Sequence, residues 1–397
     1  MLIFENVRAI LPDAVRDCCV AVRDGKIAGV EERFGEPDAK RIDGHGLFLS
    51  PGFVDIHVHG GGGRETMECD PLAVAAMCRA HLAHGTTCML PTLSAAPLST
   101  TFAAIDACRA AIEGGLAPNA AGIHLEGPFL SPAQAGAQLS ENLLIPAETD
   151  FEPLLDRWKG LRMVGAAPEL PGALRLGRAC RARGITASVA HSDATLDEVE
   201  RAWENGFTDI THLYSGCSGV VRRGGFRIPG VIEAGLLLEH ITVQVIGDLC
   251  HLPAGLLRLI YKCCGPDRIS LITDALCFAG TDLREGEHCF QKNGQECIYE
   301  DGVLKMTDRQ AFCGSVATSD RLVRNIRSIG VSWPEAVRMA SATPARAAGI
   351  PNKGQLRAGF DADLLLFDEN VELHGVWLGG KSVELSGEKE GAATERE

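Results

Sequence analysis

The first 49 residues alternate short apolar runs with turns and show no helical period. The runs are LIFENVRAIL, CCVAVRDGKIAGVEE and HGLFLSPG, and the second contains Asp24-Gly25, a typical two-residue hairpin turn. After Pro51 the pattern changes to apolar runs that alternate with Ala- and Leu-rich amphipathic segments. This alternation is typical of βα units built around a parallel sheet.

Eight short apolar runs follow Pro51, each separated from the next by a helix candidate or a long loop. They are GFVDIHV, TTCMLPT, AAGIHLEG, RMVGAAPE, ITASVAHS, FTDITHLY, ITVQVIGD and ISLITDA. Two helix candidates carry end signals, since Gly85 closes one and Thr195 and Glu198 open another in a capping-box pattern. Eight successive βα units predict an α/β fold with a TIM-type (β/α)8 barrel rather than an open doubly wound sheet.

The rest of the chain predicts a second, smaller domain. A polar, hairpin-rich insertion from about Gly280 to Thr307 and two helical segments follow the eighth run, and strand texture then returns. We expect residues 1–50 and 355–385 to form one small β-sandwich domain, split in sequence, and residues 51–354 to form the barrel. The charged stretch 386–397 lacks a core period, and we expect it to be disordered.

Composition narrows the partners and the compartment. The 397 residues carry a net charge of -14, and nucleic acids or anionic membranes demand a concentrated basic surface, so neither is an expected partner. No run reaches about 18 uninterrupted apolar residues and the N-terminus lacks a basic leader, so we expect a cytoplasmic protein. The 15 cysteines include no Cys-x-x-Cys pair, which favours reduced, core-filling thiols over a secreted disulfide framework.

The first run after Pro51 ends in GFVDIHVHG. Residues two apart in a strand project to the same side, so His57 and His59 are expected to share one space. A His-x-His pair is also common in sites without metal. Partners elsewhere in the chain must therefore decide whether this pair binds a metal.

Titratable residues follow five of the eight runs, where the active-site groups of a βα barrel collect. They are His57, His59, Glu126, His191, His212 and Asp274. Each alone has an ordinary explanation, such as a helix cap for Glu126 or Asp274 and a core hydrogen bond for His191. Together, four histidines and two carboxylates at one rim predict a divalent metal site, with His124 as a weaker candidate. Zinc suits these nitrogen and oxygen ligands, and Fe2+ or Mn2+ is an open alternative.

An arginine cluster follows the sixth run. The segment GVVRRGGFRIPG carries Arg222, Arg223 and Arg227 among glycines in an otherwise acidic protein. The planar guanidinium fork suits phosphate, so the segment is a candidate phosphate-binding loop. A solvated basic loop is the alternative.

Several motifs resemble those of the amidohydrolase superfamily. They are PGFVDIHVHG, HLEGPFLSPAQAGAQ, VAHSDAT, THLY, LITDA and GQLRAGFDADLLLFD, and the resemblance runs from Met1 to about Leu385. The motifs look most like those of deacetylases of N-acetylated amino-sugar phosphates. Dihydroorotases and hydantoinases instead carry a bridging lysine on the fourth strand, which RMVGAAPE lacks.

The resemblance implies metal-dependent hydrolysis of an N-acetyl amide. Glu126, His191 and His212 would hold one ion, and the pair His57 and His59 allows a second. Asp274 would be the catalytic residue that carries the proton from water to the departing amine.

The resemblance also implies contacts with a sugar phosphate. They fall at Ala137, Ser215, Gly216, Arg227, His251 and Phe312. Arg227 would reach the neighbouring site of a homodimer, and His251 would share the phosphate. Related chains usually have Asn-Ala where this one has Ser215-Gly216, so the identity of the N-acylated sugar stays open between glucosamine, galactosamine and others. Another amidohydrolase reaction and a noncatalytic scaffold are more distant alternatives.

Overall fold

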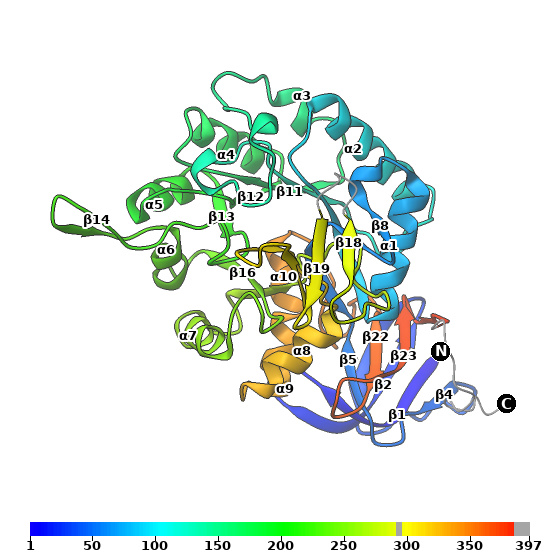
Figure 1. The fold of residues 1–397 in the computed structure, drawn as a ribbon. Coiled ribbons are helices and arrows are strands. Elements are labelled where there is room, and N and C mark those ends of the chain that lie inside the picture. The colour runs from blue at the N-terminus through cyan, green and yellow to red at the C-terminus, as the bar shows by residue number, and fades with distance from the viewer. Residues whose placement is uncertain (291–295, 385–397) are drawn as a thin grey trace.

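The computed structural model of the protein describes residues 1–290 and 296–384, and the predicted tail at 386–397 lies outside them. Eight parallel strands form its central sheet (Figure 1). In spatial order they are β17 (Ile269–Ile272), β16 (Thr242–Ile246), β13 (Phe207–Ile210), β12 (Thr186–Val189), β11 (Leu161–Ala166), β10 (Ile123–Glu126), β9 (Thr86–Leu93) and β6 (Phe53–Val58). Where β17 meets β6, the Asp274 N–H donates to His57 O at 2.9 Å, so the sheet nearly closes. The predicted TIM-type barrel is confirmed.

The barrel strands alternate between two environments, as a side-chain period of two requires. In β12, Ala187 and Val189 pack in the main hydrophobic core with residues of the surrounding helices. Ser188 lies on the opposite face, where its Oγ donates to Asp209 at 2.8 Å. The polar side chains of the strands therefore gather inside the barrel.

Helices surround this sheet (Figure 1). They are α1 (Pro71–Ala83), α2 (Leu98–Glu113), α3 (Glu152–Leu155), α4 (Ala173–Ala182), α5 (Leu196–Glu204), α6 (Val231–Leu237), α7 (Ala254–Cys264), α8 (Ser319–Ser328), α9 (Trp333–Met339) and α10 (Ala342–Ala347), with short 3-10 turns η1 (Thr66–Glu68), η2 (Pro132–Gln134) and η3 (Ser140–Asn142). The predicted capping box opens α5, because Thr195 N donates to Glu198 Oε2 at 2.8 Å and Thr195 Oγ1 accepts from Glu198 N. Within the described part of the chain, every helix is too short or too polar to cross a bilayer.

Both ends of the chain contribute to the second sheet. Its strands are β24 (Lys381–Ser382), β23 (Leu373–Leu378), β22 (Leu364–Phe367), β5 (Phe48–Pro51), β1 (Leu2–Ile10), β2 (Val15–Arg23) and β3 (Lys26–Glu31), with β4 (Lys40–Asp43) paired to β1. The sheet curls over its own core, since Phe4 of β1 meets Trp377 of β23 with ring centroids 4.8 Å apart. This confirms a small β domain built from both termini; its exact boundaries stay a prediction.

The insertion after the eighth barrel strand is a four-stranded antiparallel sheet. Its strands are β18 (His288–Phe290), β19 (Glu296–Glu300), β20 (Val303–Met306) and β21 (Phe312–Gly314), so it extends beyond the predicted end at Thr307. A disulfide joins Cys297 to Cys313 within it. The expectation that all cysteines are reduced is wrong for this pair, because strand pairing brings together two sulfurs that are distant in sequence.

Two short hairpins complete the described fold. One, β7 (Gly60–Gly61) with β8 (Arg64–Glu65), follows His59 directly. The other, β14 (Val221–Arg223) with β15 (Phe226–Ile228), carries the arginine cluster. Figure 1 shows this second hairpin projecting from the body at the left of the view.

Candidate active site

The six candidate residues at the strand ends converge in space. His57 lies in β6, His59 follows it, and Glu126 ends β10. His191, His212 and Asp274 each lie two residues past a strand end, with φ of 44°, 23° and 47°. Residues other than glycine rarely adopt this left-handed region, and such strain gathers at functional sites. The turn after each of these three strands is therefore shaped around one candidate residue.

The Glu126 carboxylate lies among all four histidines. Its Oε1 is 2.8 Å from His212 Nε2 and 3.1 Å from His191 Nε2. The same oxygen is 3.5 Å from His57 Nε2, and Oε2 is 3.3 Å from His59 Nε2. One carboxylate oxygen thus faces His191 and His212 while the other faces His59.

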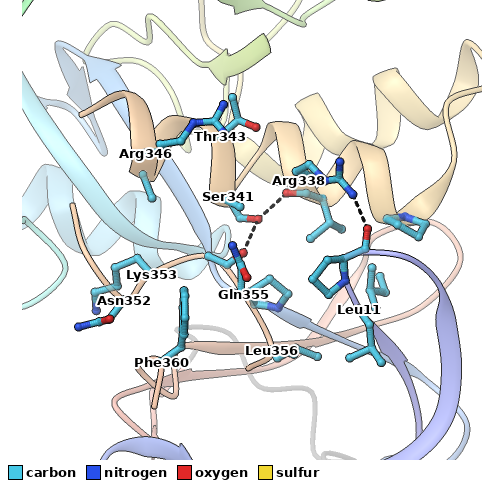
Figure 2. A pocket seen from close by; sticks show the side chains of 18 of the residues that line it. Leu11, Arg338, Ser341, Thr343, Arg346, Asn352, Lys353, Gln355, Leu356 and Phe360 are labelled. Carbon is cyan, nitrogen blue, oxygen red and sulfur yellow. Dashed lines mark hydrogen bonds between the residues drawn. The ribbon is translucent and has the colours of Figure 1, made fainter. Parts of the chain in front are cut away.

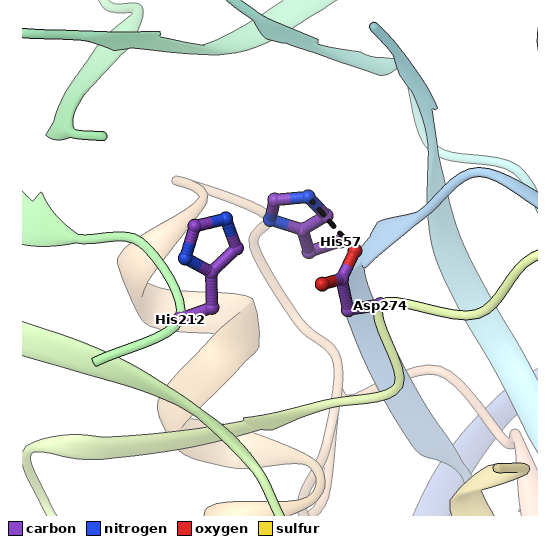
Figure 3. Close-up of side chains that lie close together, drawn as sticks. All are labelled: His57, His212 and Asp274. Carbon is purple, nitrogen blue, oxygen red and sulfur yellow. Dashed lines mark ion pairs between the residues drawn. The ribbon is translucent and has the colours of Figure 1, made fainter. Parts of the chain in front are cut away.

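Asp274 approaches the same centre from β17. Its Oδ1 is 3.3 Å from His59 Nε2 and 3.5 Å from His57 Nε2, and these two nitrogens are 3.2 Å apart. Figure 3 shows the side chains of His57, His212 and Asp274 directed toward one another. With 18% of its side chain exposed, Asp274 is the most accessible of the six, so it is the one best placed to meet a substrate.

The second ring nitrogen of each histidine is engaged away from the centre. His191 Nδ1 lies 2.7 Å from Gln134 O and His212 Nδ1 lies 2.9 Å from Ser215 O. A backbone carbonyl can only accept, so both Nδ1 atoms carry the proton. Nε2 is then the atom that each ring offers to Glu126, either as a donor or, once its proton is displaced, as a metal ligand. This is the tautomer that a metal-binding histidine needs.

Burial and mutual attraction set the charges of the site. Burial lowers the pKa of His57 to about 4. Burial alone would raise the pKa of Asp274, but the nearby histidines, His57 first, lower it to about 2. Burial likewise opposes ionisation of Glu126, yet His57 and its other histidine neighbours hold its pKa well below the ordinary value. Two ionised carboxylates therefore lie in a buried pocket of imidazoles.

The donor set fits a divalent cation. Nε2 atoms and carboxylate oxygens face one another at 2.8 to 3.5 Å, and a divalent cation that replaces the protons between them would be bound by both kinds of ligand. Three groups have ligand atoms within 4.8 Å of one another: His57, His59 and Glu126; Glu126, His191 and His212; and His57, His212 and Asp274. Imidazole and carboxylate ligands suit zinc and also permit iron or manganese.

Two further polar side chains face this centre. Gln138 Nε2 donates to Glu126 Oε2 at 2.7 Å. His124 is fully buried, its Nδ1 lies 3.0 Å from Ile56 O, and its Nε2 has no hydrogen-bond partner among the described residues. A buried nitrogen without a partner, beside a cluster of candidate metal ligands, can bind a group that the protein itself does not supply.

Two of the implied substrate contacts lie against the histidines, and a third lies in a loop that contacts the same cluster. Ser215 supplies the carbonyl for His212 Nδ1, and a Cβ on Gly216 would come within 2.7 Å of His191 Nδ1. Gly216 also has φ of 57°, so both its backbone conformation and the lack of space for a Cβ favour glycine. Ala137 is exposed in the loop between Gln134 and Gln138, which contacts the same cluster.

The other implied contacts fall into two separate places. His251 Nδ1 donates to Asp248 at 2.7 Å, and its ring meets Phe312 with centroids 4.9 Å apart. The segment after Phe312 joins the turn of Asp274, because Leu276 N donates to Ser315 O at 2.9 Å. Arg227, by contrast, is exposed on the projecting hairpin and contacts Gly225 O. The structure thus keeps Arg227 apart from the other candidates within one chain.

Sequence reasoning missed the residues that hold the histidines in place. Ser94 Oγ lies 3.1 Å from His59 Nδ1, and Gln244 Oε1 lies 3.0 Å from His57 Nδ1. Gln244 had a visible signal, since it is an amide between two valines in the apolar run ITVQVIGD. Ser94 had a weaker one, as a polar residue just past the end of β9.

A cavity of about 450 Å³ lies elsewhere, where α9 and α10 meet the turn after β1 (Figure 2). Arg338, Arg346 and Lys353 line it. Arg338 pairs with Asp267 at 3.1 Å, Lys353 pairs with Asp363 at 2.5 Å, and Arg346 donates to a backbone carbonyl. Among the described residues, its cations are thus already engaged, and the candidate chemistry stays at the strand ends.

Comparison with known proteins decides the family. The model of the amidohydrolase family matches residues 48–383. The chain belongs to the amidohydrolase family. The resemblance inferred from its motifs is confirmed, and the chain is a hydrolytic enzyme.

Relatives of this amidohydrolase include two kinds of deacetylase. It is 30% identical over 373 residues to N-acetylglucosamine-6-phosphate deacetylase from Lysinibacillus sphaericus, covering 91% of this chain and 92% of that protein. It is 32% identical over 367 residues to N-acetylgalactosamine-6-phosphate deacetylase from Escherichia coli O157:H7, covering 91% and 93%. The solved complex of Mycobacterium smegmatis N-acetyl-D-glucosamine-6-phosphate deacetylase with N-acetyl-D-glucosamine-6-phosphate matches with a TM-score of 0.86 and 28% identity, covering 96% of this chain and 98% of that one.

Proposed function

We propose that this amidohydrolase hydrolyses the N-acetyl amide of N-acetylglucosamine 6-phosphate to glucosamine 6-phosphate and acetate, a step of amino-sugar catabolism. The observation that carries the proposal is the convergence of four Nε2 atoms, Glu126 and Asp274 at one rim of the barrel. Relatives with the same fold and related sequences are named for this reaction.

Different residues of this chain bind the metal and transfer the proton. Glu126, His191 and His212 would hold one divalent ion, most simply zinc, and His57 and His59 would make room for a second. A bound divalent metal activates water at neutral pH and polarises the amide carbonyl. Asp274, the most exposed of the six, takes the proton from that water and delivers it to the departing nitrogen.

Recognition of the phosphate group determines which sugars bind. His251, held by Asp248, lies on the rim beside Phe312, and Arg227 is presented on a hairpin that leaves its own barrel. We place Arg227 in the site of a second copy, so the active form is a homodimer. We also place the enzyme in the cytoplasm, because a phosphate ester made there is retained by the apolar bilayer.

The galactosamine epimer is the second candidate substrate. A relative that is 32% identical is named for it, and Ser215-Gly216 departs from the usual Asn-Ala at the rim. A serine hydroxyl offers fewer hydrogen bonds than an amide, which alters how a sugar hydroxyl is read.

Acetate release from three compounds tests the proposal: N-acetylglucosamine 6-phosphate, its galactosamine epimer and unphosphorylated N-acetylglucosamine. The protein is loaded with zinc and, separately, with iron or manganese, and Asp274→Asn reports contaminating activity. Preference for the glucosamine phosphate supports the leading proposal, and preference for the epimer selects the second. No release from any of the three, with metal content verified, refutes both.

A further inference from the structure

A buried polar chain crosses the interior of the barrel to reach His57. Asp209 on β13 accepts from Gln244 Nε2 of β16 at 2.7 Å, and Gln244 Oε1 lies 3.0 Å from His57 Nδ1 on β6. All three side chains are completely buried. Ser188 and Thr242 donate to the same Asp209 carboxylate at 2.8 and 2.6 Å. Nothing in the proposed reaction uses Asp209 or Gln244 directly.

The hydrogen-bonding capacity of each group leaves one assignment of protons. Asp209 already accepts from two hydroxyls, and an ionised carboxylate can only accept, so the Gln244 atom facing it is the NH2 group. The Gln244 carbonyl oxygen must then face His57. That oxygen accepts only, so His57 carries its proton on Nδ1, and the Nε2 lone pair is directed at Glu126 and Asp274.

His57 differs here from two of its neighbours. His191 and His212 have their Nδ1 protons fixed by backbone carbonyls, which no side-chain substitution removes. For His57 the corresponding acceptor is a side chain, and the orientation of that side chain depends on a second one. Burying a carboxylate and an amide is unfavourable unless both are hydrogen-bonded. The hydrogen-bonded series from Asp209 through Gln244 therefore serves His57 specifically.

We propose that Gln244 and Asp209 are positioning residues that fix the tautomer and ring orientation of His57, and thereby set the affinity for the metal ion that His57 and His59 share. The proposal rests on the metal centre of the proposed function. It adds that the two halves of that centre depend on different parts of the barrel. Loss of the hydrogen bonds from Asp209 through Gln244 to His57 weakens binding of the ion at His57 and His59. Binding of the ion at Glu126, His191 and His212 is retained.

Two variants that change position 244 separate this role from general packing. Gln244→Met keeps an unbranched side chain of similar length and removes the acceptor, while Asp209 retains its bonds from Ser188 and Thr242. The double variant Gln244→Glu, Asp209→Asn keeps an acceptor oxygen for His57, and the new amide at position 209 can donate to the new carboxylate, so no two carboxylates face each other. Ser188→Ala is the matched control, because it removes a donor to Asp209 from the same buried cluster without interrupting the path to His57.

Zinc binding to the full-length protein is the readout, measured by competition with a chromophoric chelator. We expect Gln244→Met to weaken the zinc held at His57 and His59 by about 10- to 100-fold, the usual effect of losing an outer partner of a ligating histidine. The double variant Gln244→Glu, Asp209→Asn and the control Ser188→Ala should bind zinc as the wild type does. The thermal midpoint of each metal-free variant establishes that it is folded, and nitrogen-15 NMR of metal-free wild type should show His57 protonated on Nδ1.

The outcomes separate the inference from the proposed function. Wild type that binds no zinc refutes the metal centre itself. Wild type that binds zinc, with folded Gln244→Met binding it equally well, overturns the positioning role alone. The role is also overturned if Ser188→Ala loses as much affinity as Gln244→Met, or if His57 is protonated on Nε2 in the metal-free protein.

Discussion

The projecting hairpin gives a quantitative prediction about assembly. Phe226 on β15 is 76% exposed, next to Arg227, which the proposed homodimer places in the neighbouring site. Fully burying a phenylalanine contributes roughly 1.5 to 3 kcal/mol, so covering the exposed part contributes about 1 to 2 kcal/mol per subunit. A twofold interface contains the contact twice, giving about 3 kcal/mol. Phe226→Ala should therefore raise the dimer dissociation constant by about 100-fold.

Sedimentation equilibrium measures that constant. Phe290→Ala is the control, since Phe290 is 64% exposed on β18, away from the hairpin, and its loss should leave the dimer unchanged. Specific activity of Phe226→Ala should also fall on dilution and recover at high protein concentration, because in the proposed homodimer the partner subunit completes the phosphate site. An unchanged dissociation constant, or activity that persists in demonstrated monomers, would refute the assignment of the hairpin to the subunit interface.

Three further predictions concern the site and the barrel interior. Mixing the impaired variants Arg227→Ala and Asp274→Asn should restore acetate release, because a mixed dimer contains one site with Asp274 and the partner's Arg227; activity equal to the sum of the separate variants would contradict this. Chelation should abolish activity, and zinc at about 100 times its dissociation constant should restore it and stabilise the fold by about 2.7 kcal/mol in thermal unfolding; an unshifted midpoint would argue against a site formed only in the folded state. Burial raises the pKa of Asp209 from 3.8 to about 6, so the folded protein holds a proton there that the unfolded chain has lost between these values. The free energy of unfolding should therefore fall as pH rises through this window, by up to about 3 kcal/mol relative to Asp209→Asn at 1.36 kcal/mol per pH unit, measured by urea unfolding of the metal-free protein. A difference between the two proteins that does not vary with pH would contradict the raised pKa.

The barrel could be predicted because its strands are enclosed on both faces and read as short apolar runs. The residues at the rim could be predicted too, since polar groups such as Glu126 and His191 follow those runs directly. Their convergence required only that parallel strands end on the same side.

The supporting contacts could not be predicted in the same way. Gln244 reaches His57 across the barrel interior, although β17 lies between their strands in the sheet. Such a contact depends on the curvature of the nearly closed sheet, and no local pattern in the sequence indicates it. The Cys297–Cys313 disulfide likewise depends on the pairing within the insertion, where β20 pairs with both β19 and β21.

The split β domain bears on how the chain is made. Strand β5 pairs with β1 on one side and with β22 on the other, so its second side lacks a neighbour until more than 300 further residues have been synthesised. During that interval the edge of β5 carries unpaired backbone groups, the kind of edge that recruits other chains. A nascent chain that stalls before Leu364 therefore exposes an open sheet edge even if its barrel has formed. Completion of the last strands protects the first ones.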